Sequence, residues 1–263
     1  MQIRLSGPPQ APVLIYLPGL HGDWTLIGSL KAALAERVRF VEITYPRTTT
    51  WTLGDYAAGV LSALQQAGIA RGWLLAESFG SQVAWKIVDL TSSKAGESAF
   101  TAVGLILAGG FVKHPMPSIV RLAQRANRAV SMRGLTAFCR VYGLYAKFRH
   151  RRAPEAFVGV KDFIINRSDE QDRQAIACRY TLIQTNDLCQ IARAAKIPVY
   201  QLAGLIDPIV PWFSVRRWLK RNCPAYAGSK VLWGADHNVL GTAPAAAARQ
   251  ILQWMDQNVH RAP

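Results

Sequence analysis

The stretch Trp73–Ala84, with the sequence Trp-Leu-Leu-Ala-Glu-Ser-Phe-Gly-Ser-Gln-Val-Ala, places the strongest constraint on the fold. An apolar run typical of a buried strand ends at Ser78, and the small residues after it favour the start of a helix. A serine at such a turn holds its hydroxyl above the sheet, and small residues two positions before and after it let strand and helix pass closely. Ala76 and Gly80 occupy those positions. The pattern therefore predicts a nucleophile elbow, with Ala76 in place of the usual glycine.

Apolar runs and amphipathic segments alternate along most of the chain. Alternation of this kind is typical of a mostly parallel sheet with helices on both faces, so we expect an α/β fold. The predicted strands are residues 2–5, 13–17, 38–45, 73–77, 102–108, 197–203 and 230–233, and the predicted core helices are 53–67, 80–90, 212–221 and 245–259. From about 111 to 195 the alternation stops, and this stretch is predicted to form several helices instead.

Length and cysteine usage limit the class of protein. A chain of 263 residues, half of them hydrophobic, buries one large core. The cysteines are far apart and have no metal-ligand spacing, which argues against a disulfide framework and a zinc site; they are Cys139, Cys178, Cys189 and Cys223. The apolar run Val13–Leu17 is too short for a signal-peptide core or a membrane span. We therefore expect a cytoplasmic protein with free thiols.

The formal charge of +15 favours anionic partners. Much of the excess lies between Lys113 and Arg152, where there is no acidic residue. The basic residues of this stretch are Lys113, Arg121, Arg125, Arg128, Arg133, Arg140, Lys147, Arg149, Arg151 and Arg152. The sequence argues against nucleic acid as a partner, because no zinc-finger, RNP-like or helix-turn-helix pattern accompanies the charge.

Three loops supply what a serine nucleophile needs, namely a base, an orienting carboxylate and donors for an oxyanion. The glycine-rich Pro18–Gly22 follows the strand 13–17 and suits backbone N–H groups that approach a substrate oxygen. Asp207 and His237 each come just past the end of a late predicted strand. The chain order Ser78, Asp207, His237 accompanies the elbow pattern. Asp236 adjoins the histidine, but neighbouring side chains in an extended loop point apart, which favours Asp207.

With these motifs in this order, the sequence resembles the α/β-hydrolase fold superfamily, and within it the serine esterases that carry a helical cap. The resemblance implies Ser78 as nucleophile, His237 as general base and Asp207 as the orienting carboxylate. It also implies an oxyanion hole formed by the backbone N–H groups of Leu20 and Phe79. Two further residues are candidates for the substrate pocket: His21, which the loop indicates is structural or pocket-lining, and Glu77, at the variable position of the elbow. No metal or organic cofactor is implied.

The resemblance also implies a division of the chain and a class of substrate. Residues 1–110 and 196–263 would form the hydrolase core, and residues 111–195 a helical cap over the site. A basic cap suggests an anionic substrate or carrier, such as an acyl-carrier protein, a coenzyme A thioester or an acidic lipid surface. We expect a carboxylic ester hydrolase that acts on a small-molecule or carrier-bound acyl ester through an acyl-enzyme. An acyl thioesterase with the same triad and a non-catalytic homologue that binds an anionic partner remain alternatives.

Overall fold

The computed structural model describes residues 1–93, 99–130, 134, 137, 141 and 169–259. Its centre is a seven-stranded sheet with the order β1-β3-β2-β4-β5-β6-β7. The strands are β1 (Gln2–Ser6), β2 (Val13–Leu17), β3 (Arg39–Thr44), β4 (Arg71–Glu77), β5 (Thr101–Ala108), β6 (Val199–Gly204) and β7 (Tyr226–Leu232). Only the pairing of β1 with β3 is antiparallel in this sheet. The predicted α/β fold is confirmed.

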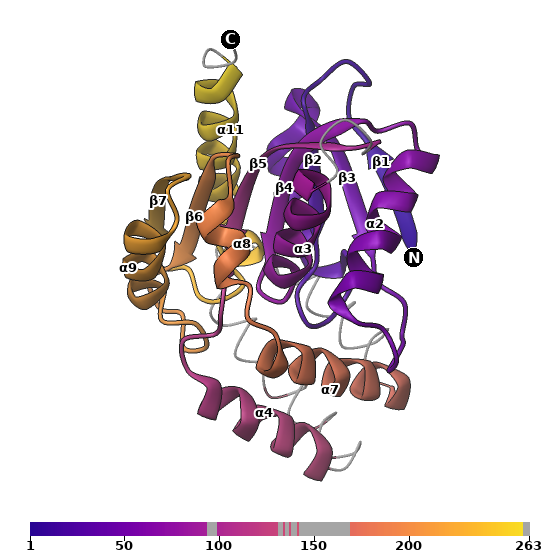
Figure 1. The fold of residues 1–263 in the computed structure, drawn as a ribbon, viewed down its shortest axis with the longest axis vertical. Coiled ribbons are helices and arrows are strands. Elements are labelled where there is room, and N and C mark those ends of the chain that lie inside the picture. Colours follow the sequence, from indigo (N-terminus) through magenta and orange to yellow (C-terminus); the bar gives the residue numbers. More distant parts are fainter. Residues whose placement is uncertain (94–98, 131–133, 135–136, 138–140, 142–168, 260–263) are drawn as a thin grey trace.

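Two apolar layers hold helices on opposite faces of the sheet. Because side chains alternate along a strand, Ile15 and Leu17 of β2 enter one layer, whereas Leu14 and Tyr16 enter the other. The first layer includes α2 (Leu53–Gln66), α3 (Gly80–Ser93), α8 (Cys189–Ala194) and α9 (Trp212–Asn222), and the second includes α1 (Gly28–Leu34) and α11 (Pro244–Val259). Figure 1 shows α2, α3 and α8 in front of the sheet.

Several short elements depart from the sequence-based expectation. The short helices η1 (Thr25–Ile27), α1, η2 (Ala35–Arg37) and α10 (Val239–Thr242) were not predicted. Strand β7 begins at Tyr226, four residues before the predicted start, and pairs with β6 along its length. Strand β7 is at the edge of the sheet, and most of its residues are half-buried or exposed. Its first half therefore lacks the apolar pattern by which a buried strand is predicted.

Helices α4 (Pro117–Ala129) and α7 (Glu170–Thr185) lie side by side beyond the carboxyl ends of the strands (Figure 1). Gln124 joins them by donating from Nε2 to Thr181 Oγ1 at 2.7 Å. Helix α8 falls within 111–195 but packs on α3 of the core. Cap boundaries 111–195 remain a prediction, and part of this range, including Cys139, Arg133, Arg140, Lys147, Arg149, Arg151 and Arg152, lies outside the described residues.

Within the described ranges, no helix combines the length and apolar character that a bilayer crossing requires. The cytoplasmic location remains a prediction.

Candidate active site

The turn between β4 and α3 has the geometry of a nucleophile elbow. Ser78 has a φ of 47° and is the one non-glycine residue with positive φ in the described part of the chain. Its N–H donates to the carbonyl of Ala108 on the neighbouring strand at 3.0 Å, which fixes the turn against β5. A Cβ at Gly80 would lie 2.3 Å from the carbonyl oxygen of Leu17, so α3 starts against β2 where a side chain has no room. Ala76 is fully buried, and the core accommodates its methyl group.

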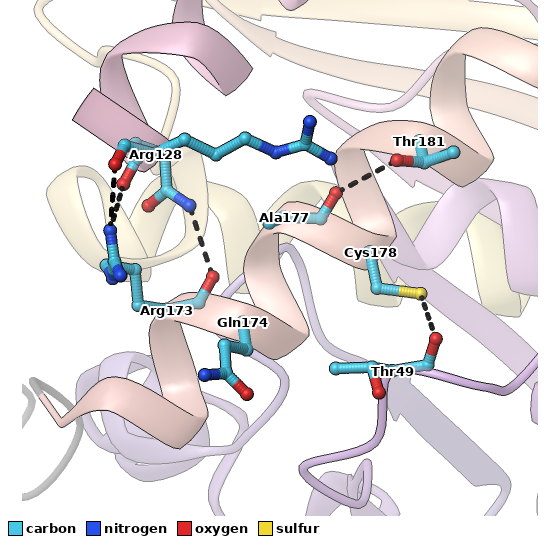
Figure 2. A pocket seen from close by; sticks show the side chains of 8 residues that line it. Thr49, Arg128, Arg173, Gln174, Ala177, Cys178 and Thr181 are labelled. Atoms are coloured by element: carbon cyan, nitrogen blue, oxygen red, sulfur yellow. Dashed lines mark hydrogen bonds between the residues drawn. The ribbon is translucent and has the colours of Figure 1, made fainter.

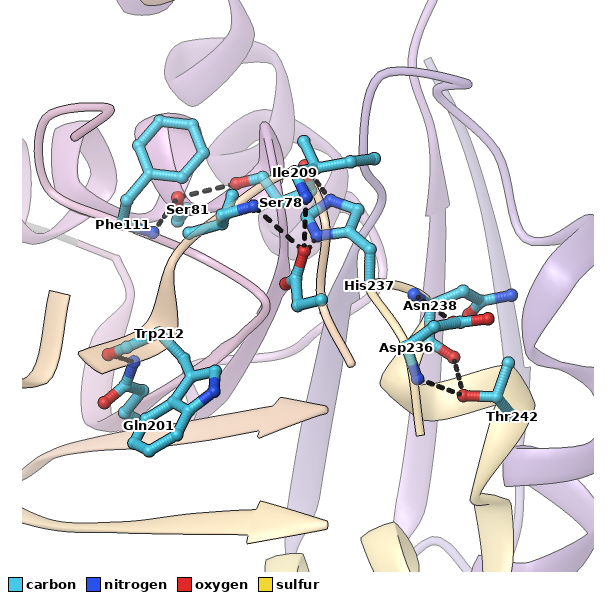
Figure 3. A network of polar contacts seen from close by, with 12 residues as sticks. Ser78, Ser81, Phe111, Gln201, Ile209, Trp212, Asp236, His237, Asn238 and Thr242 are labelled. Carbon is cyan, nitrogen blue, oxygen red and sulfur yellow. Dashed lines mark hydrogen bonds and ion pairs between the residues drawn. The ribbon is translucent and has the colours of Figure 1, made fainter. Parts of the chain in front are cut away.

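Ser78, His237 and Asp207 form one chain of contacts, although they lie on loops after β4, β7 and β6. His237 Nε2 is 2.9 Å from Ser78 Oγ, and His237 Nδ1 is 2.9 Å from Asp207 Oδ2. Figure 3 shows Ser78 facing the His237 ring. Because a carboxylate accepts, Nδ1 carries the hydrogen of this pair, and Nε2 is left to accept the serine proton.

Asp207 is fixed at both carboxylate oxygens. Its Oδ1 accepts the backbone N–H groups of Ile209 and Val210, each at 2.9 Å, and its side chain is fully buried. The adjacent Asp236 is turned elsewhere, since its Oδ1 accepts the N–H of Asn238 at 3.0 Å and its backbone N–H donates to Thr242 (Figure 3). The structure therefore brings Asp207, and not Asp236, to the imidazole.

Opposing effects act on the pKa of His237. Burial lowers this pKa, but the hydrogen bond and charge of Asp207, with smaller contributions from the Glu77 and Asp236 carboxylates, raise it by more. The net result is a pKa above its ordinary value of 6.5. The imidazolium is the state that these carboxylates stabilise, which is the state a base reaches after it has taken a proton.

The glycine loop after β2 packs against the serine. A Cβ at Gly19 would lie 3.4 Å from Ser78 Cβ, and Leu20 lines the cavity in front of Ser78. The backbone N–H groups of Leu20 and Phe79 donate to no acceptor within the described part of the chain. Two unused N–H donors at these positions are what an oxyanion hole requires.

A buried arginine of α7 fastens this loop. Arg179 is 1% exposed, and its Nη1 donates to the carbonyl of Leu20 at 2.6 Å. Its Nη2 donates to the carbonyl of Pro46 at 3.1 Å, and its Nε to the hydroxyl of Tyr56 at 3.3 Å. One guanidinium thus ties α7, the glycine loop and the segment after β3 together. Sequence reasoning missed this residue.

In front of Ser78 lies a cavity of about 440 Å³, bounded by the core loops on one side and by α4 and α7 on the other. Most of its lining is apolar, from Leu20, Leu26, Phe111, Ile119, Val120, Ala123, Ile176, Ile183, Pro208 and Ile209. Its polar side chains are His21, Glu77, Ser78, His114, Asn127, Tyr180, His237 and Asn238. No lysine or arginine belongs to this lining among the described residues.

Sequence reasoning also missed His114 and Tyr180 in this lining. Burial, with the nearby His237, lowers the pKa of His114 to about 4, so its ring is neutral at pH 7. Its Nδ1 accepts the N–H of Met116 at 3.2 Å. Neither residue stands in a sequence motif. The only pattern that could have indicated His114 is a single histidine in the loop after a predicted strand, and no pattern indicates Tyr180.

A second hollow, of about 450 Å³, is lined by residues of α4 and α7 and by Thr49 (Figure 2). Arg173 is held there by Glu170 at 2.6 Å and donates to the carbonyls of Asn127 and Arg128, each at 3.1 Å. Arg128 itself is exposed. Ser78 does not line this hollow. Within the described ranges, no group of three or more His, Cys, Asp or Glu residues could hold a metal ion.

Residues 14–250 match the model of the Alpha/beta hydrolase family. The chain belongs to this family. Comparison with the curated proteins found no match.

Solved structures with the same fold include several esterases. A thermophilic esterase from Thermogutta terrifontis is similar with 18% identity and a TM-score of 0.72, over 98% of this chain and 93% of that one. A structure from a study of carboxylesterases of Nitrososphaera gargenis has 15% identity and a TM-score of 0.79, over 99% and 96% of the two chains. An enol-lactonase from Burkholderia xenovorans has 16% identity and a TM-score of 0.73, over 97% and 96%. At these identities the likeness concerns the fold.

Proposed function

We propose that this α/β hydrolase cleaves carboxylic esters through an acyl-enzyme intermediate. The observation that carries the proposal is the chain of two 2.9 Å contacts from Ser78 Oγ through the His237 ring to Asp207. It lies at an elbow whose serine has a positive φ, and backbone strain of this kind concentrates at functional sites. The esterases among the solved structures of similar fold support the same class of reaction.

In the proposed reaction, His237 carries the proton between Ser78, the leaving alcohol and water. Ser78 Oγ attacks the ester carbonyl while His237 Nε2 takes the hydroxyl proton, and the N–H groups of Leu20 and Phe79 hold the oxyanion. Collapse of this intermediate breaks the bond to the alcohol, which leaves with the proton from His237. Water, deprotonated by His237, then attacks the acyl-enzyme, and Ser78 recovers its proton as the carboxylic acid departs. Asp207 keeps the ring oriented and stabilises the imidazolium in both halves.

The mainly apolar cavity favours an acyl group with a hydrocarbon part. Outside the cavity, α4 presents Arg121, Arg125 and Arg128 to solvent, and the whole chain has a formal charge of +15. We infer that an anionic carrier or surface, such as an acyl-carrier protein, a coenzyme A moiety or acidic lipid, would approach on this side. Its negative charge would remain outside while the acyl group enters.

The test is hydrolysis of p-nitrophenyl esters from acetate to palmitate, compared with acyl thioesters of equal chain length. We expect the oxygen esters to be hydrolysed, with an optimum chain length set by the cavity. Faster hydrolysis of thioesters at every length would instead identify a thioesterase. Lack of turnover of both series, together with failure of a serine-directed fluorophosphonate to label the protein, would favour a non-catalytic homologue.

The pH dependence of kcat/KM follows from the state that His237 needs as a base. The ring must be neutral to accept the Ser78 proton, and its pKa is raised. We therefore expect activity to fall as pH decreases through a value above 6.5, the ordinary pKa of histidine. A pH profile measured on one p-nitrophenyl ester checks this result. A profile that stays flat well below pH 6 would contradict the role of His237.

A further inference from the structure

Glu77 is a buried carboxylate beside the nucleophile that raises the pKa of His237 but has no contact with the substrate in the proposed reaction. It is 4% exposed, lines the cavity and directly precedes Ser78. Its Oε2 accepts the hydroxyl of Tyr16. Burial and the adjacent Glu77 raise the pKa of Tyr16 well above 10, so this hydroxyl keeps its proton and acts as the donor.

A further polar side chain lies close to the same oxygen, Oε2. His21 Nε2 is 4.0 Å from Glu77 Oε2 and 2.8 Å from the carbonyl of Asp23. Because a carbonyl only accepts, the hydrogen on Nε2 is directed at Asp23. Glu77 Oε1 accepts no hydrogen bond from the described residues, yet it is not among the described atoms that are sealed from solvent without a partner. Glu77 lines the cavity, so Oε1 is the oxygen of this carboxylate that is available to a ligand there.

Among the described residues, Glu77 is the one carboxylate that lines the cavity, whereas Arg121, Arg125 and Arg128 of α4 are exposed outside it. No lysine or arginine is part of the described lining, and His114 is neutral at pH 7 because its pKa is about 4. A largely buried carboxylate is stabilised by a ligand that supplies a hydrogen-bond donor, and it repels a second carboxylate.

Resting on the proposed hydrolase function, we propose that Glu77 selects the substrate. The cavity takes acyl esters that carry a hydrogen-bond donor, a hydroxyl or an ammonium group, which binds Glu77 Oε1. It discriminates against acyl groups that carry a carboxylate. Negative charge on the substrate is then confined to the carrier or leaving group outside the cavity.

The test compares methyl esters with a common four-carbon acyl group in a pH-stat. These are methyl butyrate, methyl 2-hydroxybutyrate, methyl 3-hydroxybutyrate, methyl 3-aminobutyrate and monomethyl succinate. We expect at least one donor-bearing ester to exceed butyrate about tenfold in kcat/KM, and monomethyl succinate to fall about tenfold or more below it. Ratios between esters cancel any change that affects all of them equally.

Glu77→Gln is the decisive variant, because it removes the charge and keeps an acceptor for Tyr16. We expect kcat/KM of the ammonium ester relative to butyrate to fall, and the ratio of succinate to butyrate to rise about tenfold, because both ratios depend on the charge. Glu42→Gln is the matched control, since Glu42 is also buried on a strand but pairs with Lys31 at 2.6 Å outside the cavity. Its ratios should equal those of the wild-type protein.

Three outcomes would overturn the proposal. Equal ratios in wild-type and Glu77→Gln proteins, with methyl butyrate hydrolysed, would overturn it alone and leave the hydrolase function intact. A wild-type preference for monomethyl succinate would do the same. If the wild-type protein hydrolyses none of these esters and nothing in the chain-length series, both proposals fail.

Discussion

Replacing Ser78 with alanine is expected to reduce ester hydrolysis by on the order of 10⁴- to 10⁶-fold, which is the cost when a triad nucleophile is removed. The hydroxyl that His237 contacts at 2.9 Å is lost, so no acyl-enzyme can form. The fold should persist, because the elbow is held by backbone contacts such as the one from Ser78 N to Ala108. The measurement is kcat/KM on the preferred p-nitrophenyl ester, together with fluorophosphonate labelling.

Ser92→Ala is the matched control for this variant. Ser92 lies exposed near the end of α3, the helix that starts at the elbow. Its replacement should leave both labelling and turnover at the wild-type level. Hydrolysis by Ser78→Ala at more than about a tenth of the wild-type rate would show that another group is the nucleophile.

Replacing Arg179 with methionine is expected to lower stability and turnover together. The change leaves the carbonyls of Leu20 and Pro46 without the donors that now lie at 2.6 and 3.1 Å. A fully buried carbonyl left unpaired costs about 1–3 kcal/mol, and these two are half-buried, so we expect a loss of about 1–3 kcal/mol in the free energy of unfolding. With the Leu20 carbonyl released, the glycine loop that holds the proposed oxyanion donor Leu20 N–H loses its orientation, and kcat should fall about 10- to 100-fold. Thermal unfolding and steady-state kinetics measure the two effects.

Arg125→Met is the control, because it makes the same substitution at an exposed position of α4. It should change stability by less than about 0.5 kcal/mol. Arg179→Lys should recover only part of the loss, since one ammonium group cannot reproduce a planar fork of donors. A drop in melting temperature with kcat unchanged would mean that Arg179 acts on stability alone.

The site residues that could be predicted from the sequence are those that come directly after a strand. Ser78, Asp207 and His237 each stand just after an apolar run, so the order of runs and loops was enough to place them at one edge of the sheet. The fold was predictable for the same reason. The elbow pattern even tolerated Ala76, because the requirement is for a small residue.

What escaped prediction depends on long-range contacts or weak local patterns. Arg179 meets Leu20 across 159 positions of sequence, and Tyr16 meets Glu77 across 61, so no local spacing indicates either pair. Helix α1 has only seven residues, too few for a clear apolar periodicity. Strand β7 contains Gly228 and Ser229, which have low strand propensity, and only its pairing with β6 reveals its full length.

The positions of the three candidate catalytic residues also set the order in which function can emerge during folding. Ser78 and His237 are 159 residues apart, and they meet only when β6 and β7 have joined the sheet beyond β5. A refolding intermediate that contained only β1 to β5 and α3 would have the elbow but not His237, the proposed base. Recovery of hydrolysis after dilution from denaturant would therefore report the docking of the last two strands, a step that probes of α-helix content do not isolate.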